Sequence, residues 1–195
     1  MLNTDNENIA ARCPWCSNDP IYQSYHDDVW GRARRESKDL FAKLCLDGQQ
    51  AGLSWITILK KEASYYEAYD QFEPQKIVHY DAIKIEELMQ NTGIVRNRLK
   101  INSIIKNAKG FLDIEAKETT FSDFIWSFVD GNVIQNNWQT MADVPVSTPE
   151  SETMSKALKQ RGFSFVGPTI CYAFMQAVGM VNDHLVSCPQ WKACQ

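Results

Sequence analysis

The stretch from Asp47 to Trp55 combines residue types that could recognise a flat polar ring. Two glycines, two glutamines and a serine lie between this acid and this tryptophan. Glycine permits sharp turns and a close approach to a ligand, and the glutamine and serine side chains can donate or accept hydrogen bonds. The plain structural alternative is that a helix ends here and that Ser54 caps the next helix.

Cysteine and histidine residues gather near both ends of the sequence, where they could hold a metal ion. The residues are Cys13, Cys16, His26, His184, Cys188 and Cys194. A CxxC pair such as Cys13 and Cys16 is either a redox pair or half of a zinc site. A thiolate and an imidazole from each end would complete a tetrahedral zinc site. The alternative is a set of unrelated buried thiols and imidazoles.

Four large aromatic residues lie between positions 14 and 31, among histidine and aspartate residues. Such a density of aromatic rings with polar tips favours the wall of a binding site. Ordinary core packing is the alternative, because large aromatic side chains are mostly buried. The four residues are Trp15, Tyr22, Tyr25 and Trp30.

The composition of the 195 residues, with 44% apolar and 23% charged residues, is typical of a globular protein. No apolar run approaches the ~20 residues that cross a bilayer, and the polar first twelve residues lack the apolar segment of a secretory signal. Six cysteines without such a signal favour free thiols or metal ligands. We therefore expect a cytoplasmic protein without a membrane partner. Residues 1–12 are expected to be a disordered lead-in and residues 13–195 a single domain.

The net charge of −4 argues against a nucleic-acid partner, but the distribution of charge qualifies this. Residues 88–112 contain five basic residues and no acid, and residues 153–182 contain three basic residues and no acid. Acid-free windows in an acidic chain predict one electropositive face. Chance clustering on a solvated helix surface is the alternative.

Apolar residues recur at helical spacing along most of the chain, and no long segment alternates with the period of a strand. The sequence therefore predicts an all-α fold. The expected helices cover residues 37–46, 54–72, a segment from Asp81 to about Thr92-Gly93, a segment that begins among residues 96–100 and carries apolar residues from Ile101 to Leu112, and residues 121–129, 148–161 and 167–179. Residues 131–145 are expected to form a connecting loop.

Residues 88–105 resemble a helix-hairpin-helix element that binds DNA. Two predicted helices flank Thr92-Gly93-Ile94-Val95, and the second helix starts among Arg96, Arg98 and Lys100. Free N–H groups at a helix start attract phosphate oxygens, and nearby cations strengthen the attraction to the DNA backbone. Any helical hairpin with a basic start would look similar, and the usual second hairpin glycine is replaced here by Arg96 or Asn97.

Long stretches of this chain resemble the bacterial DNA-3-methyladenine glycosylase I family of the helix-hairpin-helix superfamily. The stretches that carry the resemblance are Arg12-Cys13-Pro14-Trp15, Tyr25-His26-Asp27 to Trp30-Gly31, Gly48 to Lys61, Ser155 to Lys159, Arg161-Gly162-Phe163, Phe165-Val166-Gly167 and Thr169 to His184. The resemblance implies an all-helical glycosylase fold that binds alkylated double-stranded DNA. It also implies a structural zinc ion that ties the N- and C-terminal segments together through Cys13, His26, His184 and Cys188. Cys16 and Cys194 are then spare, with Cys16 a competing ligand.

The resemblance also implies roles for the pocket residues. Tyr25 and Trp55 would stack on the base, with Trp15, Tyr22 and Trp30 around them. The acid that recognises the base is a glutamate in the family, and this chain has the shorter Asp47 in its place. Gly52 and Leu53 would lie at the gap that the extruded nucleotide leaves. Gly93, Arg96, Arg98 and Lys100 would contact the DNA backbone.

The implied reaction is the hydrolytic release of 3-methyladenine. Methylation at N3 makes the adenine cationic, so the base leaves neutral and needs little acid catalysis. Base flipping costs a few kcal/mol, and an aromatic cage contributes roughly 0.5–2 kcal/mol for each cation–π contact. No Schiff-base lysine is implied, so we expect a monofunctional, monomeric enzyme that does not cut the strand. The alternatives are a lesion-binding protein without activity and a zinc-stabilised helical module that binds no DNA.

Overall fold

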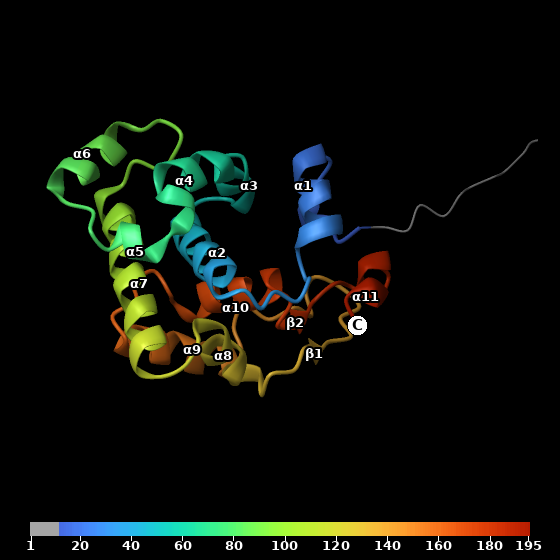
Figure 1. Ribbon diagram of the computed structural model, residues 1–195. Coiled ribbons are helices and arrows are strands. Elements are labelled where there is room, and N and C mark those ends of the chain that lie inside the picture. Colours follow the sequence, from blue (N-terminus) through green and yellow to red (C-terminus); the bar gives the residue numbers. More distant parts are fainter. Residues whose placement is uncertain (1–11) are drawn as a thin grey trace, which may run out of the picture.

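A computed structural model describes residues 12–195, which are mostly helical as predicted (Figure 1). The disordered lead-in predicted for residues 1–12 lies outside the described residues, except for Arg12. The elements are a 3-10 turn at Pro14–Cys16, α1 (Pro20–Ser24), a π-helical turn at Tyr25–Val29, α2 (Ser37–Gln50), α3 (Trp55–Leu59), α4 (Glu62–Ala68), a 3-10 turn at Asp70–Phe72, α5 (Pro74–Ile77), α6 (Ala82–Gln90), α7 (Arg98–Lys117), α8 (Phe121–Trp126), a 3-10 turn at Ser127–Val129, β1 (Ile134–Gln135), α9 (Pro149–Gln160), α10 (Pro168–Ala177), β2 (Val181–Asn182) and α11 (Pro189–Ala193). No helix among them is long and apolar enough to cross a membrane.

Helix α2 lies inside the fold, and every residue from Leu40 to Gln49 is buried. It packs against α3, α7, α8 and α10, as expected of a helix that is apolar on most sides. The predicted end of this helix at residue 46 is wrong, since α2 continues to Gln50. This extension places Asp47 in the last turn of a buried helix.

The long helix predicted over residues 54–72 is divided into α3, α4 and a 3-10 turn. Ser54 precedes α3 in an extended conformation at the predicted N-cap position, but its side chain makes no capping hydrogen bond and pairs with the Thr57 hydroxyl at 2.8 Å instead. The chain then takes left-handed φ angles at Asp70, Gln71 and Phe72. This turn seats the ring of Phe72 fully in the core, where it stacks on Tyr69 at 5.8 Å between ring centroids. Burial of the aromatic ring thus outweighs helical continuity.

The hairpin between α6 and α7 differs from the prediction at its glycine. Asp81 caps α6 by accepting from the Lys84 N–H at 2.9 Å, as predicted. Helix α6 ends at Gln90, and Gly93 does not adopt the left-handed conformation expected of a C-cap. A Cβ atom at Gly93 would lie 2.8 Å from Cβ of Ser64 on α4. The glycine is therefore needed for close packing against α4.

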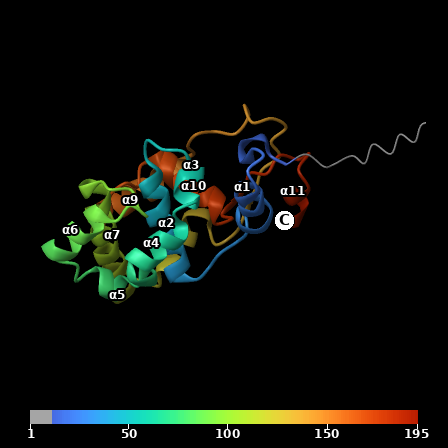
Figure 2. The ribbon, with the colours of Figure 1, turned by 90° about the horizontal axis from the view of Figure 1, so that it is seen from above.

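The two ends of the described chain lie side by side. Helices α1 and α11 occupy the same end of the molecule in both views, far from α6 (Figures 1 and 2). The parallel pair β1 and β2 lies near them, with Ile134 opposite Val181. The prediction of an unstructured loop over 131–145 missed β1, because isolated two-residue pairing leaves no periodic signal. Helices α9 and α10 start at Pro149 and Pro168, as predicted.

Candidate active site and metal centre

A cavity of about 300 Å³ lies among the N-terminal segment, α2, α3 and α10. The residues around it are Trp15, Tyr22, Tyr25, Trp30, Lys43, Asp47, Gln50, Trp55, Met141, Val144, Pro145, Ala173, Gln176, Ala177 and Asp183. The structure therefore brings together all five aromatic residues that were predicted for a base pocket, and it adds the predicted acid. The volume suits a small aromatic ligand, since ligand pockets typically start at about 300 Å³.

The aromatic side chains meet at angles rather than in parallel stacks. The rings of Trp15 and Trp30 lie 4.9 Å apart at 62°, and those of Trp15 and Tyr22 lie 5.1 Å apart at 60°. Tyr25 and Trp55 approach to 5.5 Å at 45°. Edge-to-face contacts of this kind stabilise aromatic clusters.

Asp47 is 2% exposed, and its two carboxylate oxygens differ in their surroundings. Oδ1 accepts a hydrogen bond from the Lys43 ammonium, whereas Oδ2 is buried without a partner among the described residues. Burial raises the pKa of Asp47, while the charge of Lys43 opposes this shift. An unpaired buried acceptor costs about 1–3 kcal/mol. The carboxylate is thus suited to receive a donor from a ligand.

Lys43 is a pocket residue that the sequence analysis missed. Its ammonium lies 3.8 Å from the centre of the Trp55 ring, and burial lowers its pKa. The signal was available, because Lys43 precedes Asp47 by four residues and such residues share one face of a helix. The indole Nε1 of Trp55 is also buried without a partner among the described residues.

Asp183 is a second buried carboxylate at this cavity, and the sequence analysis did not single it out. Its Oδ1 accepts from Asn136 at 2.7 Å and from Trp138 at 2.8 Å. Its Oδ2 accepts from Tyr172 at 2.6 Å and from Gln176 at 2.8 Å. Both oxygens are therefore occupied. The carboxylate ties the segment that follows β1 to α10.

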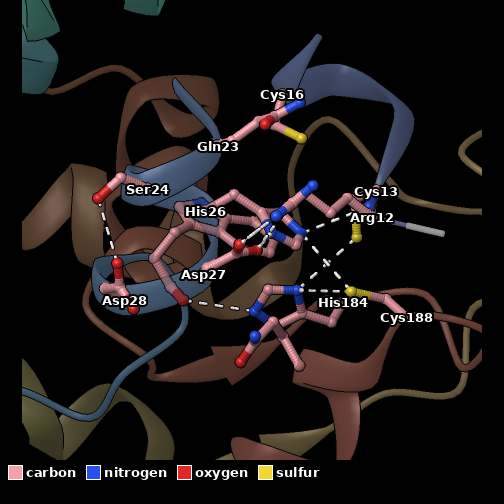
Figure 3. Close-up of polar contacts among 12 residues, drawn as sticks. Arg12, Cys13, Cys16, Gln23, Ser24, His26, Asp27, Asp28, His184 and Cys188 are labelled. Atoms are coloured by element: carbon pink, nitrogen blue, oxygen red, sulfur yellow. Dashed lines mark hydrogen bonds and ion pairs between the residues drawn. The ribbon is translucent and has the colours of Figure 1, made fainter. Parts of the chain in front are cut away.

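Cys13, His26, His184 and Cys188 form a buried group whose ligand atoms all lie within 4.8 Å of one another (Figure 3). Nδ1 of His184 lies 3.7 Å from Sγ of Cys13 and 3.8 Å from Sγ of Cys188, and Nε2 of His26 lies 3.6 Å from Sγ of Cys188. Tetrahedral zinc, bound at about 2.3 Å by sulfur and about 2.1 Å by nitrogen, would hold such atoms about 3.6 Å apart. The group can therefore bind a metal ion.

The histidines of this group are fixed from behind, as in metal centres. Nδ1 of His26 lies 2.7 Å from a carboxylate oxygen of Asp27, which also pairs with Arg12 at 2.8 Å. Nε2 of His184 lies 3.3 Å from the carbonyl oxygen of Trp30. The Cys16 sulfur lies apart from the four ligand atoms in Figure 3 and contacts the Ser17 carbonyl at 3.9 Å. Cys16 is therefore outside the group, and competition from it is not supported.

The group of two cysteines and two histidines supports one wall of the cavity. The ring of Trp30 packs edge-on against His184 at 4.6 Å and stacks on His26 at 6.3 Å. The Trp30 ring also meets Trp15 of the cavity, at 4.9 Å between ring centroids. The group thus joins residues from both ends of the chain directly behind the aromatic side chains. The sequence alone could not show that the group and the cavity are neighbours.

The basic residues predicted to contact DNA fall into two classes. The prediction for Lys100 is wrong, because its side chain is buried and its ammonium donates to the carbonyl oxygens of Gln49 at 2.6 Å and Ala51 at 2.7 Å. These bonds satisfy the C-terminal end of α2. Arg96 and Arg98 are exposed, and Arg98 forms a surface ion pair with Glu86.

Gly52 and Leu53 lie on the loop between α2 and α3. Gly52 has a φ of 77°, and Leu53 is an exposed apolar residue with 41% of its surface accessible. Gln50 and Trp55, on either side of this loop, both line the cavity. An apolar side chain thus projects from the loop that borders the pocket.

Residues 15–191 match the methyladenine glycosylase family. The chain is 52% identical over 181 residues to the DNA-3-methyladenine glycosylase of Haemophilus influenzae, covering 93% of this chain and 98% of that protein. It is 50% identical over 177 residues to DNA-3-methyladenine glycosylase 1 of Escherichia coli, covering 91% and 95%. A crystal structure of a 3-methyladenine DNA glycosylase I superposes with a TM-score of 0.91 at 50% identity, covering 92% and 98% of the two chains. The chain therefore belongs to the methyladenine glycosylase family.

Proposed function

We propose that this protein releases 3-methyladenine from alkylated double-stranded DNA by hydrolysing the N-glycosidic bond, and that it does not cut the strand. The observation that carries the proposal is an aromatic cavity with one unpaired carboxylate oxygen, on Asp47. A relative that is 40% identical was crystallised in complex with 3-methyladenine, and it superposes with a TM-score of 0.88 over 91% of this chain and 96% of its own.

The chemistry follows from the charge of the lesion. The methylated base is a cation inside DNA, and it takes the electron pair of the N9–C1′ bond when it leaves. A water molecule supplies oxygen to C1′ and loses a proton to solvent. The rings of Tyr25 and Trp55 would hold the base flat, and Oδ2 of Asp47 would accept from its exocyclic amine. Cation–π contacts of roughly 0.5–2 kcal/mol each favour the charged base over normal adenine.

We propose that the loop at Gly52 and Leu53 meets the duplex, with Leu53 at the gap left by the flipped nucleotide. The segment 88–105, with Gly93, Arg96 and Arg98, would contact phosphates as a helix-hairpin-helix element. The second acid-free window adds exposed lysines on α9, Lys156 and Lys159. Backbone cations of this kind provide affinity that does not depend on sequence.

We further propose that the group of two cysteines and two histidines holds zinc with a structural role. Four protein ligands leave no open position for chemistry. The sulfur–nitrogen distances of 3.6–3.8 Å and the supporting contact from Asp27 fit this metal. A single domain over residues 13–195, a monomeric state and a cytoplasmic location complete the proposal.

The test is chromatography of the bases released from methylated duplex DNA by the wild type, Asp47→Asn and Asp113→Asn. Asp113 is an exposed acid that pairs with Lys117 on the surface of α7 and serves as the matched control. The wild type and the control should release 3-methyladenine, and Asp47→Asn should be slower by about 100-fold or more, the usual loss for one group that stabilises a transition state.

The opposite result would favour the non-catalytic alternative. If folded wild-type protein binds methylated DNA but releases no base, the chain is a lesion-binding protein. If it binds no duplex even at low salt, the helical module without a DNA role is correct. Strand breaks that accompany base release would refute the monofunctional reaction.

A further inference from the structure

Lys43 has bonding capacity that the proposed function does not use. An ammonium group has three N–H donors. One donates to Oδ1 of Asp47, and the group lies over the ring of Trp55 at 3.8 Å from its centre. The side chain is 6% exposed, yet it is one of the residues around the cavity. A remaining donor can therefore reach a ligand inside the cavity.

Together, Lys43 and Asp47 present a donor beside an acceptor. Oδ2 of Asp47 accepts hydrogen bonds and is unpaired, and the Lys43 ammonium can only donate. The complementary ligand edge has an amine next to a ring nitrogen with a free lone pair. Adenine has this pattern, with the exocyclic N6 beside N7 or N1. The O6 and N7 of guanine are both acceptors, so this edge of guanine does not match.

We propose that Lys43 is a specificity-determining residue that contacts the base, donating a hydrogen bond to a ring nitrogen of the flipped adenine while Asp47 accepts from the exocyclic amine. This inference rests on the proposed function and adds a second recognition group to it. The pocket then recognises two adjacent atoms of the base instead of one.

The charge of Lys43 also changes the electrostatics of the pocket. Lys43 and Asp47 form a buried pair with no net charge when both are ionised. An ammonium next to the cationic base opposes its positive charge, and this repulsion disappears when the base takes the electron pair of the N9–C1′ bond. The lone pair on the ring nitrogen becomes a better acceptor at the same time. Lys43 keeps its protons and favours the departing base over the bound substrate.

Binding of free bases tests the contact separately from catalysis. The probes are 3-methyladenine and its 1-deaza and 7-deaza analogues, in which CH replaces one ring nitrogen. Tryptophan fluorescence reports their dissociation constants, because Trp55 lines the pocket. Wild-type protein should bind one of the two analogues about 10- to 100-fold more weakly than 3-methyladenine, the value of one hydrogen bond to a charged group. Lys43→Met should bind that analogue and 3-methyladenine equally well.

Two further variants serve as controls. Lys38→Met changes an exposed lysine on the same helix, and it should discriminate as the wild type does. Asp47→Asn should bind all three probes more weakly but still discriminate between 3-methyladenine and the analogue, since Lys43 remains. If Lys43→Met alone does not fold, Lys43→Met with Asp47→Asn removes both buried charges, and this double variant should bind the parent and the analogue equally.

Two results overturn the inference in distinguishable ways. The Lys43 contact alone is refuted if the wild type and Lys43→Met discriminate equally between 3-methyladenine and its analogues. It is also refuted if the wild type does not discriminate between them but still releases 3-methyladenine from DNA. Failure of the wild type to bind any probe and to release any base refutes the proposed function, and the Lys43 contact falls with it.

Discussion

Asp183 and Asp47 are buried carboxylates at the same cavity, but their surroundings are opposite. Asp183 accepts four hydrogen bonds, two on each oxygen. Asp47 accepts one, from Lys43, and leaves Oδ2 without a partner among the described residues. A buried polar atom left unpaired costs about 1–3 kcal/mol. The comparison separates a carboxylate that holds the structure from one that is available to a ligand.

The same difference extends to the two regions around these residues. The region near both chain ends contains Asp183 and the group of cysteines and histidines, and its polar atoms contact one another. The region formed by Lys43, Asp47 and Trp55 leaves a carboxylate oxygen and an indole N–H without a partner within residues 12–195. Buried polar groups are normally satisfied. The first region is therefore expected to control stability and the second to control activity.

Removal of the proposed zinc ion should produce the largest loss of stability. Structural zinc contributes about 10 kcal/mol or more to the folding of small domains, and here it would join both ends of the chain. A strong chelator or Cys188→Ala should therefore lower the melting temperature by about 10 °C or more, at 2–4 °C per kcal/mol. Differential scanning calorimetry with metal analysis measures this.

Cys16→Ala is the matched control for this prediction. Its thiol is buried near the same end but contacts only the Ser17 carbonyl among its polar neighbours. Its melting temperature and zinc content should equal those of the wild type. If the purified protein contains no metal and its melting temperature does not change with the chelator, the prediction that a bound metal stabilises this region is refuted.

Asp183→Asn should cause the next largest loss of stability. Asparagine has one acceptor oxygen, so its NH₂ group would face two donors that Asp183 now satisfies. The free energy of unfolding should fall by about 2–4 kcal/mol, measured by urea denaturation. The matched change in the other region is Lys43→Met with Asp47→Leu, which replaces both charged side chains by apolar ones. It should leave stability equal or higher, because replacing a buried ion pair by apolar residues is often neutral or stabilising. Equal losses in both would break the comparison between the two regions.

The sequence predicts the helical class and several helix starts because these depend on local chemistry. Pro149, Pro168 and the cap at Asp81 are recognisable without any tertiary contact. The breaks of the helix predicted over residues 54–72 were missed, because the burial of Phe72 decides one of them. Two-residue strands leave no periodic pattern that a sequence can show.

Some site residues were predicted from the sequence, and others were missed because their role depends on tertiary contacts. The aromatic residues and the metal-binding group follow from residue types and from the resemblance to a family. Asp183 became visible only through contacts between distant elements. Lys43 was missed although it precedes Asp47 by four residues on α2, because a lysine on a helix is ordinarily solvated. Lys100 was misassigned because its positive charge was considered without its burial.

The basic residues extend the comparison to DNA binding, where the smallest effects are expected. Arg96 is exposed, whereas the Lys100 ammonium is buried and donates to the carbonyl oxygens of Gln49 and Ala51. Arg96→Ala should weaken binding to every duplex and reduce the slope of log K against log salt by about 1, the value for one phosphate contact. Lys100→Met should leave the slope unchanged and lower the melting temperature, because two buried carbonyl groups lose their donor. Fluorescence anisotropy over a salt series measures both. A reduced slope for Lys100→Met would show that a buried, satisfied cation also acts on DNA, and the distinction between satisfied and available groups would not hold for this protein.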